Sequence, residues 1–137
     1  MINSINATEQ TVAVNGNVLF TTDRVRTKAC ACGGWLQHDL GSGDFTLVRP
    51  GIYKVDFNAN ITAGAVADLT LAIESNGTVV GGTEMDYVVA VADDFQNVSA
   101  STLIVVQPFS SRTVSVSNLS TVEATVDDAN IIITRIA

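Results

Sequence analysis

The chain has few charged residues, and few of these are basic. Charged side chains make up 15% of its 137 residues, against about 25% in an average domain. Only 7 are Lys or Arg against 14 Asp or Glu, which gives a formal net charge of −7. Nucleic acids and anionic membranes bind basic patches. Since the sequence contains no basic cluster, neither is an expected partner.

Long apolar runs and a recognisable targeting segment are also missing. No run approaches the roughly 20 apolar residues that span a bilayer. The first residues, Met1 to Asn6, lack the charged and apolar regions of a signal peptide. We therefore expect a protein made in a cytoplasm that leaves it only by lysis or on a particle.

The sequence lacks the periodicity of an amphipathic helix. Instead, apolar residues recur at every second position. Apolar residues occupy every second position from Tyr53 to Ile61, and Lys, Asp and Asn occupy the positions between them. This alternation is typical of a half-buried strand. Asn76-Gly77 follows another alternating segment and predicts a tight hairpin turn.

The whole pattern predicts an all-β sandwich of about eight to ten short strands in one domain. Residues 1–10 are expected to form a short polar arm, and residues 11–137 the single domain. The segments with strand character cover residues 10–14, 18–26, 35–40, 44–47, 49–62, 69–73, 79–80, 98–107, 113–118, 121–126 and 130–136.

One segment resembles a family signature. Asp44 to Phe57, DFTLVRPGIYKVDF, is similar to the motif of the tumour-necrosis-factor-like superfamily, in particular the globular heads of complement component one q. That motif reads Gly-x-Phe-x-x-Pro-x-x-Gly-x-Tyr-x-Phe. Here the spacing between Pro50 and Gly51 is shorter, and Val55 replaces the first aromatic residue after Tyr53.

The resemblance implies a ten-strand jelly roll that assembles as a homotrimer. Within the superfamily, it implies the microbial or phage branch, because the chain shows no signal peptide or membrane anchor. Members of that branch serve as fibre tips and as decorations of particle surfaces. We therefore expect a structural protein on a virion surface, made in the host cytoplasm, with a capsid or other particle protein as partner. The alternative is a trimeric head that binds a host-surface glycan or protein.

Cys30, Cys32 and His38 form the only metal-like cluster in the sequence. On a strand, the two thiols would share one face, and a trimer would supply three copies. One chain nevertheless offers only three ligands, where a structural zinc site needs four. The alternative interpretation is that the two cysteines are small buried thiols. We predict no metal and no cofactor.

Acidic pairs mark the expected loops. Asp93-Asp94 and Asp127-Asp128, together with Glu84 and Asp86, supply oxygens of the kind that calcium binds, but they lack the spacing of a calcium loop. Solvated turn residues are the simpler reading. The expected partner-binding loops cover residues 63–68, 86–95 and 126–130, and their candidate contact residues are Tyr87, Asp93, Asp94, Phe95, Asp127 and Asp128.

No arrangement of residues predicts catalysis. His38, Asp39 and a serine are the residue types of a catalytic triad, but the sequence has no Gly-x-Ser-x-Gly motif, which forms the nucleophile elbow. The expected function is therefore non-enzymatic. Trp35 is expected in the core or at a subunit interface. Five further residues are predicted to lie in the trimer interface or the core, and the sequence leaves these two places open: Tyr53, Val55, Phe57, Phe109 and Ile132.

Overall fold

The computed structural model describes residues 1–27 and 34–137. Within these ranges the chain forms twelve β-strands and no helix, so it has no helical segment suited to crossing a membrane. The strands are β1 (Ile2–Asn6), β2 (Gln10–Val12), β3 (Thr22–Arg26), β4 (Leu36–Gln37), β5 (Phe45–Leu47), β6 (Gly51–Thr62), β7 (Ala67–Ser75), β8 (Thr78–Val79), β9 (Met85–Val89), β10 (Gln96–Val106), β11 (Arg112–Asn118) and β12 (Ala124–Arg135).

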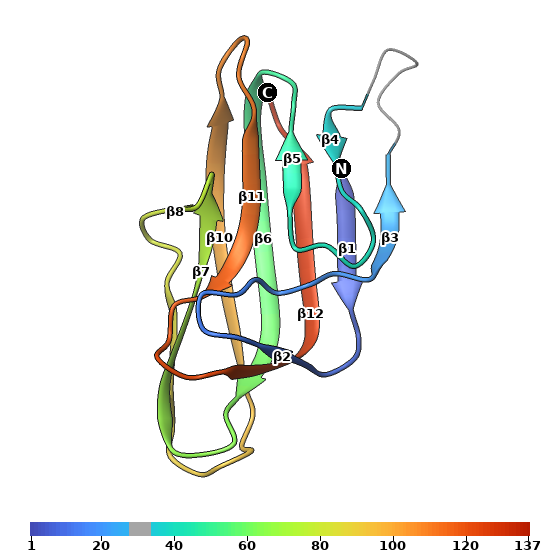
Figure 1. Cartoon of the computed structure of the whole chain (residues 1–137). Helices are drawn as coiled ribbons and strands as arrows, with labels where there is room; N and C mark the ends of the chain where they lie inside the picture. The colour runs from blue at the N-terminus through green and yellow to red at the C-terminus, as the bar shows by residue number, and fades with distance from the viewer. Residues whose placement is uncertain (28–33) are drawn as a thin grey trace.

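The strands build two six-stranded sheets with antiparallel pairing. The first sheet has the order β10-β6-β12-β1-β3, and β2 pairs with the first part of β12. The second sheet has the order β4-β5-β11-β7-β8, and β9 pairs with β7. Figure 1 shows the strands running along the long axis of the molecule, with the C-terminus at one end. We call this the terminal end and the opposite one the distal end.

The core lies between the two sheets. The predicted alternation along β6 is confirmed: every second residue from Tyr53 to Ile61 is buried. The ring of Phe20 meets Phe45 of the second sheet and Phe57 of the first edge-on, with centroids 5.4 and 6.4 Å apart. Aromatic edge-to-face contacts of this kind favour one relative placement of the sheets.

Two turns show why particular residues stand where they do. Asn76 and Gly77 both have positive φ angles, 52° and 77°, as the predicted hairpin between β7 and β8 requires. Gly51 has φ 151°, and a Cβ there would lie 2.4 Å from the carbonyl oxygen of Ala137. Glycine at this position therefore allows the C-terminal segment to pack against the start of β6.

The N-terminal segment differs from the expectation. Residues 1–10 were predicted to form a polar arm, but β1 lies inside the first sheet, between β12 and β3. Two of its polar residues, Ser4 and Asn6, are buried, and both have hydrogen-bond partners there. The Ser4 hydroxyl donates to Asp23, and the Asn6 amide donates to the carbonyl of Leu19. Polarity in this segment indicated internal hydrogen bonds and not exposure.

Several strand predictions also need correction. The two strands expected at 121–126 and 130–136 are one strand, β12, with a bulge between Asp127 and Asn130. Asp128 has φ 52°, a conformation that accommodates the extra residue without ending the strand. The segment from Val18 to Phe20 is not part of β3. β9 was missed altogether because Met85–Val89 alternates only weakly.

Candidate interaction surfaces

The residues predicted for the interface or the core separate into three places. Tyr53, Val55 and Phe57 lie in the core of the single chain, each at most 1% exposed. Ile132 lies on the other face of the first sheet, directed away from the core. Phe109 lies in the turn between β10 and β11 and is fully exposed. Trp35 belongs to the core, where it stacks on Tyr53 with centroids 5.7 Å apart.

His38 is sealed inside the protein, and its side chain is 0% exposed. Its Nδ1 lies 3.0 Å from Asp23 Oδ1, its Nε2 lies 3.1 Å from the carbonyl oxygen of Ser42, and its ring stacks on Phe45. Both nitrogens are thus engaged, so the imidazole connects β3 to the segments around β5. Cys30 and Cys32, its proposed co-ligands, lie outside the described residues.

A serine beside this histidine does not make a hydrolytic triad. Ser4 Oγ donates to Asp23 Oδ1 at 2.5 Å, the same carboxylate oxygen that lies next to His38 Nδ1. A nucleophilic serine must bond to the imidazole nitrogen that faces the substrate. Here that nitrogen, Nε2, faces the carbonyl of Ser42. The network fastens β1, β3 and the β4–β5 connection together.

The predicted acidic loops are only partly loops. Asp127 and Asp128 lie in the bulge of β12, and Tyr87 lies in β9. Asp93, Asp94 and Phe95 are exposed in the β9–β10 connection. In the described part of the chain, no three His, Cys, Asp or Glu side chains converge in a way that suits a metal ion.

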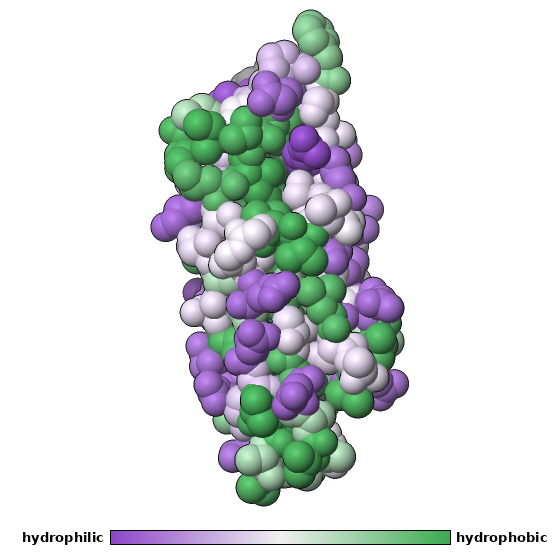
Figure 2. All heavy atoms as spheres, turned by 90° about the vertical axis from the view of Figure 1, so that its left-hand side faces the viewer, coloured by the Kyte–Doolittle hydropathy of each residue, from purple (hydrophilic) through white to green (hydrophobic). Residues whose placement is uncertain are grey.

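The outer face of the first sheet carries an apolar strip near the terminal end. The strip has two parts. On β10 and β6, Val105 lies opposite Ile52, and Leu103 lies diagonal to Ile52. On β12, β1 and β3, the side chains of Ile132, Ile5 and Val25 lie around Asn3, and the Lys54–Asp56 ion pair lies between the two parts. Leu103, Val105 and Val25 are 56%, 49% and 41% exposed. Figure 2 views the molecule from the edge that carries β10 and β8, and it shows green surface at this edge toward the terminal end. We define the apolar strip as Ile5, Val25, Ile52, Leu103, Val105 and Ile132.

The distal half of the same face is polar. Asn58 of β6 lies opposite Asn130 of β12, and Asn60 lies opposite Asn97 of β10. The amides bond to one another: Asn97 Nδ2 donates to Asn60 Oδ1 at 3.1 Å, and Asn3 Nδ2 donates to Asn130 Oδ1 at 2.5 Å. The face is thus divided into an apolar part and an amide-rich part.

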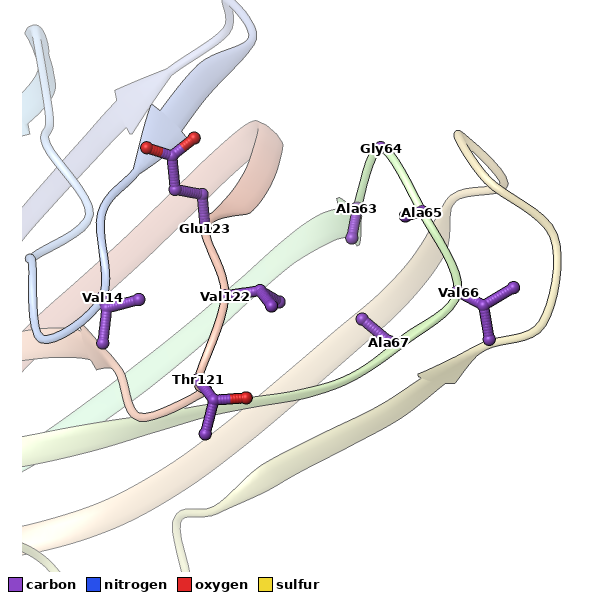
Figure 3. A pocket seen from close by; sticks show the side chains of 9 residues that line it. All are labelled: Val14, Ala63, Gly64, Ala65, Val66, Ala67, Thr121, Val122 and Glu123. Atoms are coloured by element: carbon purple, nitrogen blue, oxygen red, sulfur yellow. The ribbon is translucent and has the colours of Figure 1, made fainter.

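The distal end carries an open groove of about 470 Å³. Three segments line it: Val14, the β6–β7 connection from Ala63 to Ala67, and the β11–β12 connection from Thr121 to Glu123. Figure 3 shows Val122 pointing toward the Ala63–Ala67 segment. The lining contains no aromatic ring, and Glu123 is its one charged residue. We call it the distal groove.

Asn118 holds the walls of this groove in place. Its buried side-chain amide donates to the carbonyl oxygens of Val12 and Val122 at 3.1 and 2.9 Å, and its Oδ1 accepts from the backbone N–H of Ser120 at 2.9 Å. Its backbone pairs with Asn15 and Gly16. On the opposite wall, the N–H of Asp93 donates to the carbonyl of Ala63 at 2.9 Å. The groove is therefore built before anything binds.

Three solved structures resemble this fold. The globular domain of the zebrafish complement 1qA protein matches with a TM-score of 0.63 at 14% identity, covering 96% of this chain and 94% of that one. Eiger TNF from S. frugiperda matches with a TM-score of 0.70 at 8% identity, covering 99% and 92%. Murine APRIL matches with a TM-score of 0.60 at 10% identity, covering 98% and 99%.

This chain has the TNF-like jelly-roll fold. The expectation drawn from Asp44–Phe57 is therefore confirmed at the level of the fold. No family model matches the sequence, and no curated protein matches it.

Sequence reasoning missed two features of this TNF-like jelly roll. The distal groove is assembled from three segments far apart in the chain, and its walls are Ala, Gly and Val, which carry no chemical signature. Asn118 is one of many asparagines, and nothing in its local sequence predicts that it is completely buried. A weak signal did exist at residues 63–67, because Ala-Gly-Ala-Val-Ala is too apolar for an ordinary exposed loop.

Proposed function

We propose that this protein is a non-enzymatic structural module of a particle surface, of the phage decoration or head-fibre type, and that it assembles as a homotrimer. The observation that carries the proposal is the apolar strip. It leaves Leu103, Val105 and Val25 between 41% and 56% exposed on the outer face of the first sheet. Ile5, Ile52 and Ile132 are partly exposed on the same face, so the strip involves five strands from β10 to β3. Apolar side chains exposed together on one face are typical of an interface.

Three copies are proposed because the sequence motif resembles those of trimeric proteins and the fold is the same. A strip on the outer face of the first sheet suits packing of one copy against the next around an axis. The amide-rich half of that face would then lie at the polar border of the interface. Obligate interfaces bury 2,000 Å² or more, so the separated copy would not persist.

The non-enzymatic part of the proposal follows from the engaged polar groups. The imidazole of His38 is sealed between Asp23, Ser42 and Phe45. Among the described residues, the acidic side chains form no group that could hold a metal ion. A module of this kind functions by packing and display, with its acidic outside keeping particles apart.

A substitution in the strip tests the assembly. Leu103→Asp introduces a charge into the proposed interface, and we expect it to reduce the mass in solution to that of one chain, 14.4 kDa. Val88→Asp is the matched control, because Val88 is 65% exposed on β9 of the other sheet. Equal masses for the two variants would refute the proposed interface.

The particle assignment needs its own experiment. Antibodies against the purified chain should decorate particles isolated from the source in immunogold electron microscopy, at regular positions on the surface. If the label stays with material free of particles, the particle function is wrong, whatever the oligomeric state. The receptor-binding alternative is less favoured for a glycan, because the distal groove offers no ring on which a sugar stacks.

A further inference from the structure

Phe109 is exposed in a way that the packing of one chain does not explain. It lies in the β10–β11 turn, which projects from the terminal end in Figure 1. Its side chain is completely exposed, and its φ is 61°. Bulky residues rarely adopt this left-handed conformation, and a large apolar side chain in water contributes nothing to folding. Aromatic residues presented in this way are typical anchors of interfaces.

The distal groove is the complementary feature at the other end. It is apolar, preformed by the bonds of Asn118 and Asp93, and open to solvent. Its volume of about 470 Å³ falls within the usual range of pockets for small ligands and leaves room for a phenyl ring. Figure 3 shows that Val14, Val122 and Ala67 line the groove from three different segments.

Acidic and basic residues are distributed unequally between the two ends of the molecule. The distal half is built from residues 7–19, 58–73, 84–100 and 116–130, which contain nine acidic residues and no Lys or Arg. All basic residues belong to the other parts of the chain. Four of them lie toward the terminal end: Arg49, Lys54, Arg112 and Arg135. Glu123 lines the groove, and Arg112 follows Phe109 by three residues.

We propose that the distal groove of one copy receives Phe109 of a second copy, so that the protein stacks head to tail along its long axis. The contact joins an apolar side chain to an apolar groove and a basic end to an acidic one. Contact between two distal ends would instead bring like charges together. A head-to-tail contact that does not close into a ring produces a chain of copies.

This contact is separate from the apolar strip, and it does not depend on the proposed trimer. Each chain carries one Phe109 and one groove, at opposite ends of the sandwich. We call the smallest stable assembly the basal assembly. If it is a trimer, one end carries three Phe109 side chains and the other end carries three distal grooves. Three simultaneous contacts would then strengthen the stacking far beyond that of one contact.

Sedimentation velocity of the full-length protein over a range of concentrations tests the proposal. We expect wild-type species at multiples of the basal assembly, increasing with concentration. Phe109→Ser and Val122→Asp should each raise the concentration needed for stacking at least tenfold, and both should keep the basal mass. Val66→Asp, at a more exposed groove position, covers the case in which Val122→Asp fails to fold. Leu40→Ser and Val88→Asp are the matched controls at exposed sites outside both features, and they should stack as wild type does.

A mixture of two variants gives the sharpest result. Phe109→Ser retains the groove and Val122→Asp retains the phenyl ring, so together they can form one contact but cannot extend it. The mixture should stop at twice the basal mass. The proposal is overturned if wild type remains at its basal mass at every concentration, if either variant stacks like wild type, or if the mixture extends without limit. Leu103→Asp, which targets the apolar strip, changes the basal mass and so separates failure of the trimer from failure of the stacking.

Discussion

Asn118→Ala tests whether one buried amide holds the distal end together. The substitution removes three short side-chain hydrogen bonds, those to the carbonyls of Val12 and Val122 and that from the N–H of Ser120, together with a longer one of 3.4 Å to the carbonyl of Ala13. Asn118 is 0% exposed, so water cannot readily replace the lost partner. At about 1 kcal/mol for each net hydrogen bond, with further cost where a buried carbonyl is left unpaired, the loss is about 3 kcal/mol.

A loss of about 3 kcal/mol predicts a measurable decrease in Tm. The entropy of unfolding is about 2.1 cal/mol/K for each residue, so a loss of 1 kcal/mol lowers the Tm of a 137-residue chain by about 3.5 °C. Asn118→Ala should therefore unfold about 10 °C below wild type. Trp35 is the only tryptophan and is buried against Tyr53, so its fluorescence reports the transition.

The control for this prediction is another asparagine with an exposed bond. Asn97→Ala removes the contact with Asn60 on the outer face of the first sheet, and exposed substitutions typically change stability by less than about 0.5 kcal/mol. Both variants should be measured at one protein concentration, because association raises the apparent stability. The reasoning is refuted if Asn118→Ala melts within 2 °C of Asn97→Ala, a margin of about 0.5 kcal/mol.

Three further predictions concern the stability of the sandwich. Thr62 Oγ1 is buried and has no partner among the described residues, so Thr62→Val should stabilise the protein by about 1 kcal/mol in urea unfolding; a loss of stability would show that the hydroxyl is bonded. Asp128→Gly should be more stable than Asp128→Ala by about 1 kcal/mol, because the left-handed conformation penalises a Cβ, and equal melting temperatures would contradict the bulge. Burial raises the pKa of the Tyr53 hydroxyl, so its contribution to stability is complete below pH 10 and is lost as the pH rises through the higher pKa of the folded state. Tyr53→Phe should flatten that alkaline loss, and an unchanged pH profile would exclude Tyr53 as its cause.

The sequence predicts this fold well where one face of a strand is buried and the other is exposed to solvent. The alternation from Tyr53 to Ile61 and the Asn76-Gly77 turn have direct physical causes in the pleat and in backbone sterics, and both are confirmed. Prediction was wrong where tertiary partners override local character. Ser4 and Asn6 of β1 are polar yet buried, because Asp23 and Leu19 supply hydrogen-bond partners from distant segments.

The candidate surfaces were harder to anticipate for the same reason. Val55 and Ile132 both have the character of interface residues in the sequence, and only the register shows that one faces the core and the other faces outward. Phe109 was identified from its residue type, but its exposure became evident only from the turn that carries it. The distal groove exists only through the meeting of three connections, so no local pattern predicts it.

The mass of the wild-type chain in dilute solution tests the central claim most directly. Light scattering behind size-exclusion chromatography, at concentrations low enough to prevent stacking, should give about three times the chain mass of 14.4 kDa. A single-chain mass at all concentrations would mean that the apolar strip remains in water without a partner, and it would contradict the account.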